Sequence, residues 1–525
     1  MGSTFFGLEI AKSSIFTQQA ALNTTGHNIA NANTKGFSRQ QVNMVTNRPM
    51  EAITMVRSGQ PGQMGTGVQF DHIKRIREQF LDDQFRNENK FFGEWNVRKD
   101  TLDKIETVIN EPSDNGLSSV MENFWNGWQE LSKEPDNLTA REVVRERSLS
   151  LAESFNYTGK QLNDLTSDLT NGLGVKVTEI NTFTSQIASL NSEIYRLEGL
   201  GNDANDLRDQ RDIIMDDLSK DLNVTVKEDQ SGFNIKIGNL DLVKGSEVSA
   251  KFTMDSLTQM YKNGEISSGE VKGLFYSRDN IVENYRTQLN AMVNTLANGE
   301  ANVTLRSGTV IPEGTVLNGV TYKGTVTERT LANPLVVKVN GLNGLHELGF
   351  GLKQPLVSGI PLFETKPGFT ELTATSIQVN SLIVDDVRNI SSSSRTIDDG
   401  TGEKVIQGNG DLSILMSNMR SISFNFDPEN SRKSILSDGT IEEFYRSVVG
   451  QFGVQSQEAT RQADNQNVLV QQVDNRRSSV SGVSLDEEMA NMIKYQHAYE
   501  AAARTLNAFD QMLDKVINNM GMVGR

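Results

Sequence analysis

Residues 485–520 of this chain read LDEEMANMIKYQHAYEAAARTLNAFDQMLDKVINNM. An apolar or aromatic side chain recurs there at every seventh position, at Leu485, Met492, Tyr499, Leu506, Leu513 and Met520. A sustained seven-residue repeat on a helix makes one narrow apolar stripe, which is unstable in water until a second helix covers it. The repeat therefore predicts that this segment is a helix that needs a helical partner.

The opposite end of the chain carries the same repeat. It lies in a proline-free stretch that we expect to be helical from about residue 4 to residue 32, and its members are Leu8, Ile15, Leu22 and Ile29. Residues 1–60 hold five Lys/Arg against two Asp/Glu, whereas residues 481–525 hold four against six, so their charges weakly favour pairing. We predict that the two ends meet as an α coiled coil. An ordinary amphipathic helix on a globular core is the alternative.

The composition excludes several classes of function. The chain has 525 residues, no cysteine and a formal net charge of −16. Disulfides and cysteine-based catalytic or metal sites are thereby ruled out, and non-specific nucleic-acid binding is disfavoured because it depends on Lys and Arg. No apolar run is long enough to span a membrane, and the first residues carry no cleavable export signal. We expect a chain that stays in the cytoplasm or leaves it by a route that needs no such signal.

Residues that could carry catalysis are scattered. The histidines, His27, His72, His346 and His497, make no metal-ligand pair, and the phosphate-binding G-x-x-x-x-G-K pattern does not occur. We therefore expect no enzyme activity, no cofactor and no metal site. An enzymatic or adhesive activity in a β insertion is the alternative from another class, because folds can host chemistry on loops.

The hydrophobic periods predict a fold that is mainly α with β insertions, an α+β fold. A terminal coiled-coil domain is expected to be disordered in the free monomer, and a long helical-bundle rod domain leads to an outer β-rich domain. The expected limits are 1–50 and 480–525 for the terminal coiled-coil domain, 56–220, 255–299 and 371–478 for the helical rod domain, 222–252 for a β-hairpin region, and 301–370 for a β-rich insertion.

Local signals refine these limits. A helical region is expected to begin near Gly67, and the long heptad pattern after Pro135 is expected to kink or break at Gly172 and Gly174. Residues 391–411 are rich in Ser, Asp and Gly and predict a loop. A capping box is predicted at the start of the last helix, from Ser484 and Glu487.

An asparagine-rich segment follows the first heptad stripe. Asn28, Asn31 and Asn33 are poor helix formers, and Gly36 can supply a turn. We expect this segment to end the first helix and turn the chain, with Phe37 anchoring the turn by burial.

Four motifs resemble a known family. Residues 28–40, NIANANTKGFSRQ, are similar to the N-terminal signature of bacterial flagellar rod, hook and hook-associated proteins, and residues 481–513 resemble their C-terminal signature. Two internal stretches, NFWNGWQELS at 123–132 and DLRDQRD at 206–212, resemble the members found at the hook–filament junction. The β insertion at 301–370 resembles nothing we can name.

The resemblance implies a structural subunit of the bacterial flagellum that self-assembles into a junction ring between hook and filament. It implies export in an unfolded state by the flagellar type III apparatus, so that the protein ends outside the cell. The implied partners are the hook protein, a second hook–filament junction protein and an export chaperone on the C-terminal helix. The ten stripe residues above are the implied assembly interface. Another axial subunit, from the hook or distal rod, is the alternative because the terminal motifs are shared.

Overall fold

The computed structural model describes residues 5–48, 65–111, 113–114, 116–229, 232–400, 402–427 and 434–519. These residues are mostly helical, with strands confined to small antiparallel sheets, which confirms the expected class of α-rich α+β fold. Packing divides the chain into two units. Unit 1 comprises Met1–Trp95, Gly174–Lys272 and Ala463–Arg525, and unit 2 comprises Asn96–Leu173 and Gly273–Gln462. The four-part division expected from the sequence stays a prediction.

The helices account for most of the described chain. They are α1 (Phe6–Ala30), α2 (Gln79–Ile109), α3 (Leu117–Lys133), α4 (Leu138–Glu198), α5 (Asn205–Asp221), α6 (Met254–Lys262), α7 (Glu270–Tyr276), α8 (Glu283–Asn298), α9 (Gly341–Glu347), α10 (Ser381–Asp385), α11 (Asp411–Asn418), α12 (Ile441–Ser481) and α13 (Leu485–Asp514). Short π or 3-10 turns occur at η1 (Ser277–Val282), η2 (Val387–Asn389), η3 (Met419–Ser421) and η4 (Lys515–Asn519).

The strands are short. They are β1 (Gln40–Thr46), β2 (Val68–Arg75), β3 (Val224–Asp229), β4 (Gly232–Ile237), β5 (Leu240–Lys244), β6 (Glu247–Val248), β7 (Glu300–Leu305), β8 (Val316–Leu317), β9 (Val320–Thr321), β10 (Leu335–Asn340), β11 (Phe363–Thr365), β12 (Ile377–Val379), β13 (Thr396–Asp398), β14 (Glu403–Val405), β15 (Phe424–Asn425) and β16 (Asp438–Gly439).

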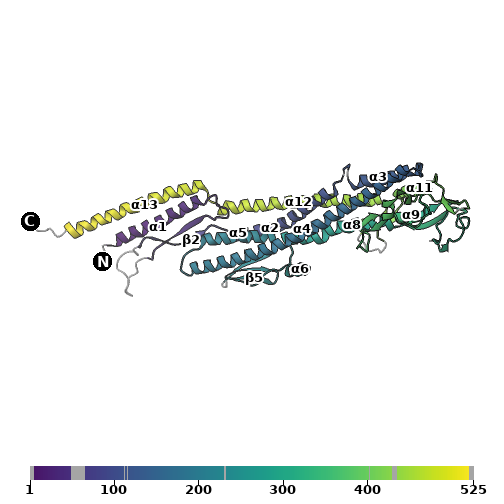
Figure 1. Cartoon of the computed structure of the whole chain (residues 1–525). Coiled ribbons are helices and arrows are strands. Elements are labelled where there is room, and N and C mark those ends of the chain that lie inside the picture. Colours follow the sequence, from purple (N-terminus) through teal and green to yellow (C-terminus); the bar gives the residue numbers. More distant parts are fainter. Residues whose placement is uncertain are drawn as a thin grey trace, which may run out of the picture. The chain divides into compact units, whose positions relative to one another are not determined.

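In unit 1 the first and last helices lie side by side, and an antiparallel strand pair packs on the first (Figure 1). β1 pairs with β2 from Gln40 opposite Arg75 to Thr46 opposite Val68. The expectation that a helical region begins near Gly67 is wrong, because the residues after it form β2. The hydrogen bonds to β1 select the extended form there, and the sequence could not reveal a partner strand that begins 28 positions upstream.

α4 runs unbroken for 61 residues, so a break at Gly172 and Gly174 is wrong, and a kink there stays a prediction. The buried stripe steps from Leu169 to Leu173 and then to Ile180. Intervals of four and of seven residues both keep side chains on one helix face, so the phase change needs no break. Each glycine costs about 1 kcal/mol relative to alanine, which the packing of a long helix offsets.

The expected β-hairpin near residues 222–252 is present as β3 and β4, with Val224 opposite Ile237. The expectation was incomplete, because β5 and β6 extend it to a four-stranded sheet in the order β3-β4-β5-β6. These added strands are too short to give a period-two signal.

Unit 2 contains the β-rich region that includes the expected insertion. Val310, Phe350 and Val405 form one buried apolar cluster, so this region continues beyond residue 370, where the expected insertion ends. The expected loop at 391–411 is only partly correct, because β13 pairs with β14 inside it. Both Trp125 and Trp128 on α3 are buried core residues.

A fully buried histidine lies in the same unit. The Nδ1 atom of His346 is 2.6 Å from the carbonyl oxygen of Ile360, and the backbone N–H of Ser391 donates to Nε2 at 2.9 Å. The ring must therefore be neutral, with its proton on Nδ1. Burial lowers the pKa of His346 to about 4. The edge of its ring also meets Trp128, with centroids 6.2 Å apart.

We predict an acid-sensitive contribution of His346 to stability. Because its folded pKa of about 4 lies below the ordinary value of 6.5, this contribution is complete above about pH 6.5 and is lost as the pH falls toward 4. The loss should be about 3 kcal/mol at ~1.4 kcal/mol per pKa unit. Urea unfolding followed by tryptophan fluorescence at pH 7.5 and 4 should show a steeper pH dependence for the wild type than for His346→Gln. The matched control is His497→Gln, at an exposed histidine. Equal pH dependences for wild type and His346→Gln would contradict the assignment.

Candidate assembly interface

The two terminal helices pack antiparallel in a single register. Gly7 on α1 lies against the ring of Phe509 on α13, so closely that a Cβ atom on Gly7 would be 2.3 Å from the ring. At the other end, Nδ2 of Asn28 donates to Oε2 of Glu488 at 3.0 Å. Between these two contacts, α1 advances from residue 7 to residue 28 while α13 runs back from residue 509 to residue 488. Both intervals are 21 residues, or three heptads, so the helices are antiparallel and in one register.

Small and polar residues line the closest part of this contact. On α1 the buried residues are Ala11, Thr17, Ala21, Thr24, Thr25 and Asn28. On α13 they are Glu488 and Ala502. Small side chains let the helix backbones approach closely, and Gly7 is the extreme case. The contact is therefore closer and more polar than a seam of large apolar residues.

The large stripe residues border this contact. Half-buried positions hold Leu8, Ile15, Leu22 and Ile29 on α1, and Met492, Tyr499, Leu506 and Leu513 on α13. Leu485 is 49% exposed. Met520 lies outside the described residues. That these residues form an assembly interface between copies stays a prediction.

The buried side of α13 lies at a second heptad position, which the apolar stripe read from the sequence does not include. Glu488, Tyr495, Ala502 and Phe509 are also seven residues apart, and this set contains both buried residues of α13. Their shared spacing was the available signal. A charged residue and an alanine in the set hid it, because neither reads as part of an apolar stripe.

The residues of the asparagine-rich segment have different roles at the end of α1. α1 ends at Ala30, and Asn31 caps it, with its side-chain Nδ2 donating to the carbonyl of His27 at 3.1 Å. Asn33 is exposed. Gly36 has a φ of +77° and lies against Ile213, so no other residue fits there without strain. Phe37 is half-buried, its ring 5.4 Å from that of His27.

Asn28 does not help to end the helix, contrary to expectation. It remains helical and is 1% exposed. Its Oδ1 accepts from the backbone N–H of Gln40 at 3.0 Å, and its Nδ2 donates to the carbonyl of Gln40 at 2.8 Å as well as to Glu488. Because its side-chain amide is fully paired in this way, Asn28 fastens α1 to the first residue of β1 and to α13.

Arg39 completes this polar contact, which we call the terminal joint and define as Asn28, Arg39, Gln40 and Glu488. Nε of Arg39 donates to Oε1 of Glu488 at 2.8 Å, and Nη1 donates to Glu487 at 2.7 Å. The backbone N–H of Arg39 donates to the carbonyl of Ser481 at 2.8 Å. The joint therefore ties the end of α1, the start of β1 and the start of α13 together.

At the N-cap of α13, the side chain of Ser484 accepts from the backbone N–H of Glu487, which is half of the expected capping box.

A buried network of arginines and aspartates adjoins the segment after α1. Its members are Arg75, Arg77, Arg86, Arg477, Asp82, Asp209, Asp212 and Asp216. The motif at 206–212 supplies two of them, Asp209 and Asp212. The N–H and hydroxyl of Ser38 each donate to Asp209 at 2.8 Å, and Nη1 of Arg75 reaches Asp209 at 2.6 Å. The network thus holds the turn after α1 against α5.

The pKa values of Asp209 and Asp212 in this motif are shifted in opposite directions. Burial raises the pKa of Asp209, and the nearby Arg75 only partly opposes this. Burial acts on Asp212 in the same direction, but Arg77, Arg75 and Arg86 together outweigh it, so the pKa of Asp212 lies below its usual range. Asp212 is therefore ionised at neutral pH and compensates several buried guanidinium groups.

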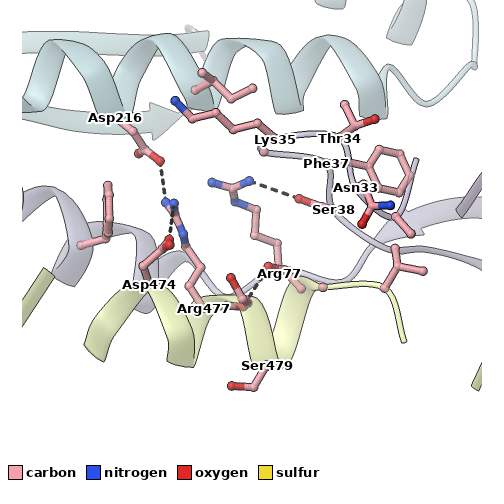
Figure 2. A pocket seen from close by; sticks show the side chains of 18 of the residues that line it. Asn33, Thr34, Lys35, Phe37, Ser38, Arg77, Asp216, Asp474, Arg477 and Ser479 are labelled. Carbon is pink, nitrogen blue, oxygen red and sulfur yellow. Dashed lines mark hydrogen bonds and ion pairs between the residues drawn. The ribbon is translucent and has the colours of Figure 1, made fainter. Parts of the chain in front are cut away.

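A cavity of about 720 Å³ opens between the turn after α1 and the link from α12 to α13 (Figure 2). The figure shows Arg77 directed at Ser38, and Arg477 between Asp216 and Asp474. The guanidinium of Arg477 also lies over the ring of Phe85, 4.1 Å from its centroid. These guanidinium groups are engaged with side chains of the protein itself, so the arrangement holds segments together.

One side of α13 remains open to solvent. Leu485, Met489 and Ile493, four residues apart, are 49%, 52% and 57% exposed. Met512 and Ile517, nearer the C-terminus, are 61% and 68% exposed. Side chains four residues apart share a helix face, so the first three form an apolar strip that α1 does not cover.

Membrane spans and metal sites are two further possibilities for the described residues. None of the helices they form is both long enough and apolar enough to cross a membrane. Within the same residues, no group of three or more His, Asp or Glu side chains could hold a metal ion.

Three protein families match parts of the chain. The flagellar hook-associated protein FlgK helical domain matches residues 102–315, the flagellar basal body rod FlgEFG protein C-terminal domain matches residues 476–520, and the flagella basal body rod protein family matches residues 8–37. The two terminal matches contain most of α1 and α13. The long middle match covers α3, all of α4 and the sheet β3–β6.

Similarity to individual proteins extends over the whole chain. The chain is 33% identical over 539 residues to flagellar hook-associated protein 1 of Bacillus subtilis, and the alignment covers 100% of both chains. It is 25% identical to flagellar hook-associated protein 1 of Escherichia coli, covering 97% of this chain and 98% of that one. A solved flagellar hook junction protein from Burkholderia pseudomallei covers 75% of this chain and 100% of the solved chain, with 13% identity and a TM-score of 0.49.

We predict that Asp212→Asn destabilises unit 1 by about 3 kcal/mol, because it leaves buried arginines without their shared anion. The matched control in the same motif is Asp206→Asn. The side chain of Asp206 is 56% exposed, so its loss should cost less than about 1 kcal/mol. Hydrogen exchange of peptides from α5 and β2 would measure both effects. Equal protection in the two variants would contradict the role given to the network.

Proposed function

Because this chain belongs to the flagellar hook-associated protein 1 family, we propose that it forms the junction ring between the hook and the filament of a bacterial flagellum. It is a structural flagellar junction subunit. The alternative of a hook or distal rod subunit is disfavoured by the match at residues 102–315, which is to a hook-associated family, whereas the terminal matches are to rod proteins. The family's structural role also argues against an enzymatic or adhesive β insertion.

The observation that supports ring assembly most directly is the paired but incompletely covered α13. Its contact with α1 is narrow, and Leu485, Met489 and Ile493 remain exposed on another side. In a ring of identical chains, a neighbouring terminal helix is the partner that can cover them. The half-buried stripe residues at the border of the α1–α13 contact would then become fully buried.

The remaining partners follow from that position. A junction ring contacts the hook protein on one side and a second hook–filament junction protein on the other. We propose that the chain is exported unfolded by the flagellar type III apparatus and ends outside the cell. Before export, a chaperone would cover the apolar side of the C-terminal helix, because such a stripe promotes aggregation when free. In the free monomer, the terminal helices are expected to lose their order.

We predict that Leu506→Asp or Leu513→Asp abolishes assembly while leaving unit 2 folded. Both side chains are half-buried at the border of the α1–α13 contact, where a carboxylate would lose hydration without gaining a partner. The matched controls are Asn507→Asp and Gln511→Asp, at exposed positions of the same helix. Motility and electron microscopy of cells carrying each variant give the readout. Normal filaments with Leu513→Asp would contradict the proposed interface.

Deletion of the gene in its native bacterium tests the function itself. We expect bare hooks on the cell surface and filament protein in the medium, because the filament would lack its base. Electron microscopy of the surface and immunoblotting of the medium would measure both. Cells without hooks would point to a rod or hook subunit, and cells with normal filaments would exclude a junction role.

A further inference from the structure

The apolar side chains of the terminal helices do not by themselves fix how far α13 slides along α1. Large apolar side chains recur every seven residues on both helices, from Leu8 to Ile29 and from Met492 to Leu513. A slide of one heptad, roughly 10 Å at 1.5 Å per residue, would leave the large side chains of both stripes at equivalent positions along the border of the contact. Because apolar burial is non-directional, neighbouring registers would bury similar area.

One layer of the contact is chemically different from the others. Asn28 is 1% exposed and Glu488 is 2% exposed, and they are opposite each other in the observed register. Both carboxylate oxygens of Glu488 are occupied, Oε1 by Arg39 and Oε2 by Asn28. Asn28 in turn exchanges hydrogen bonds with both backbone groups of Gln40. A buried polar pair of this kind is stable only where every partner is in place.

A slide by one heptad would break this pairing in either direction. From the observed register, one slide places Glu488 opposite Ala21, which is 1% exposed and has no polar side chain. The opposite slide places Tyr495 opposite Asn28, and Glu488 then lies beyond the end of α1. A buried carboxylate without a partner is strongly unfavourable. The large apolar stripes tolerate either slide, and the close contact of Gly7 with Phe509 is the other feature that a slide would disturb.

We propose that Asn28 and Glu488, with Arg39, select the register in which α13 packs on α1. In coiled coils, a single buried polar layer can fix register at some cost in stability. The terminal joint applies that device to two helices from opposite ends of one chain. The terminal joint positions α13, because the register determines where along α1 the exposed strip of α13 lies.

A covalent restraint competes with this explanation. Only Gly482, Val483 and Ser484 separate α12 from α13, and a link of this length also opposes sliding. The test must therefore remove the two restraints separately. A flexible Gly/Ser insertion of about eight residues after Gly482 spans more than the ~10 Å slide and releases the link. The double substitution Asn28→Leu with Glu488→Leu removes the polar layer and leaves the link unchanged.

Disulfide trapping reads the register of those molecules in which α1 and α13 are paired, even where pairing is transient in the free monomer. The full-length chain has no cysteine of its own to interfere. The observed register places Ser14 opposite Ala502, seven residues along each helix from the contact of Gly7 with Phe509. Ser14→Cys with Ala502→Cys therefore traps the observed register. Ser14→Cys with Phe509→Cys, or with Tyr495→Cys, traps the two registers displaced by one heptad.

With the flexible insertion and the native joint, we expect cross-linking of the observed pair to dominate. With the insertion and both leucine substitutions, we expect a displaced pair to increase by about tenfold, since the buried polar layer that disfavours the displaced registers is then absent. Two results would overturn the proposal. One is a single observed register in the leucine variant despite the insertion. The other is free sliding with the native joint.

Two further measurements separate register selection from simple stabilisation. The leucine variant should keep its helical circular dichroism and a thermal midpoint close to that of the wild type, because apolar residues replace a buried polar layer. A lower midpoint with only the observed cross-link would assign the joint a stabilising role and overturn the proposal. Glu488→Gln retains hydrogen-bonding atoms and should keep the observed register. Sliding in that variant would contradict the part given to the hydrogen bonds.

Discussion

The carboxylate of Glu488 is the point on which the terminal part of unit 1 depends. It is buried in the first turns of α13, and its partners come from α1 and from the residue before β1. Removing any partner of a buried charge is strongly unfavourable. The end of α1, the start of β1 and the start of α13 are therefore expected to fold together. The position also suits an anion, because unpaired backbone N–H groups at a helix N-terminus attract negative charge. The joint thereby couples residues that are 460 positions apart in the sequence.

Arginines with little exposure have two kinds of partner, aspartates in the network of unit 1 and backbone carbonyl oxygens around Arg141 in unit 2. In unit 1, Arg75 and Arg77 pair with Asp209, Asp82 and Asp212, and Lys176 lies 2.7 Å from Asp221. In unit 2, the fully buried Arg141 instead donates to the carbonyl oxygens of Pro135 and Ile390, and burial lowers its pKa to about 10. Buried ion pairs add little net stability once desolvation is counted, but they penalise wrong arrangements heavily. Unit 1, which carries the terminal helices, is therefore held by contacts that favour specificity.

Features that repeat along the chain, such as the heptad stripes, could be predicted from the sequence. Single residues that matter only through one distant contact could not. The heptads at both ends predicted two helices that need each other, because seven-residue spacing is visible without a structure. The closest part of their contact was not visible, because Gly7, Ala21 and Ala502 carry little hydrophobic signal. Asn28 and Glu488 carry no sequence signal of a buried pair, because their partners are distant along the chain. The prediction of helix where β2 lies is wrong because its partner strand cannot be identified from local sequence. The break assigned to Gly172 failed for a related reason, since local propensity yields to packing over a long helix.

The nested topology also orders the folding of the chain. Closing a loop of 460 residues between Asn28 and Glu488 in an unfolded chain costs at least about 5 kcal/mol of chain entropy. Contacts such as Ser38 with Asp209, 171 residues apart, and Arg477 with Asp216, 261 residues apart, shorten that loop once they form. The free chain between the fixed segments and the terminal helices is then only a few residues long. We therefore expect α1 and α13 to pair last, after the arginine–aspartate network has formed. Until then their apolar sides remain available to other helices, which is compatible with the export and assembly proposed above.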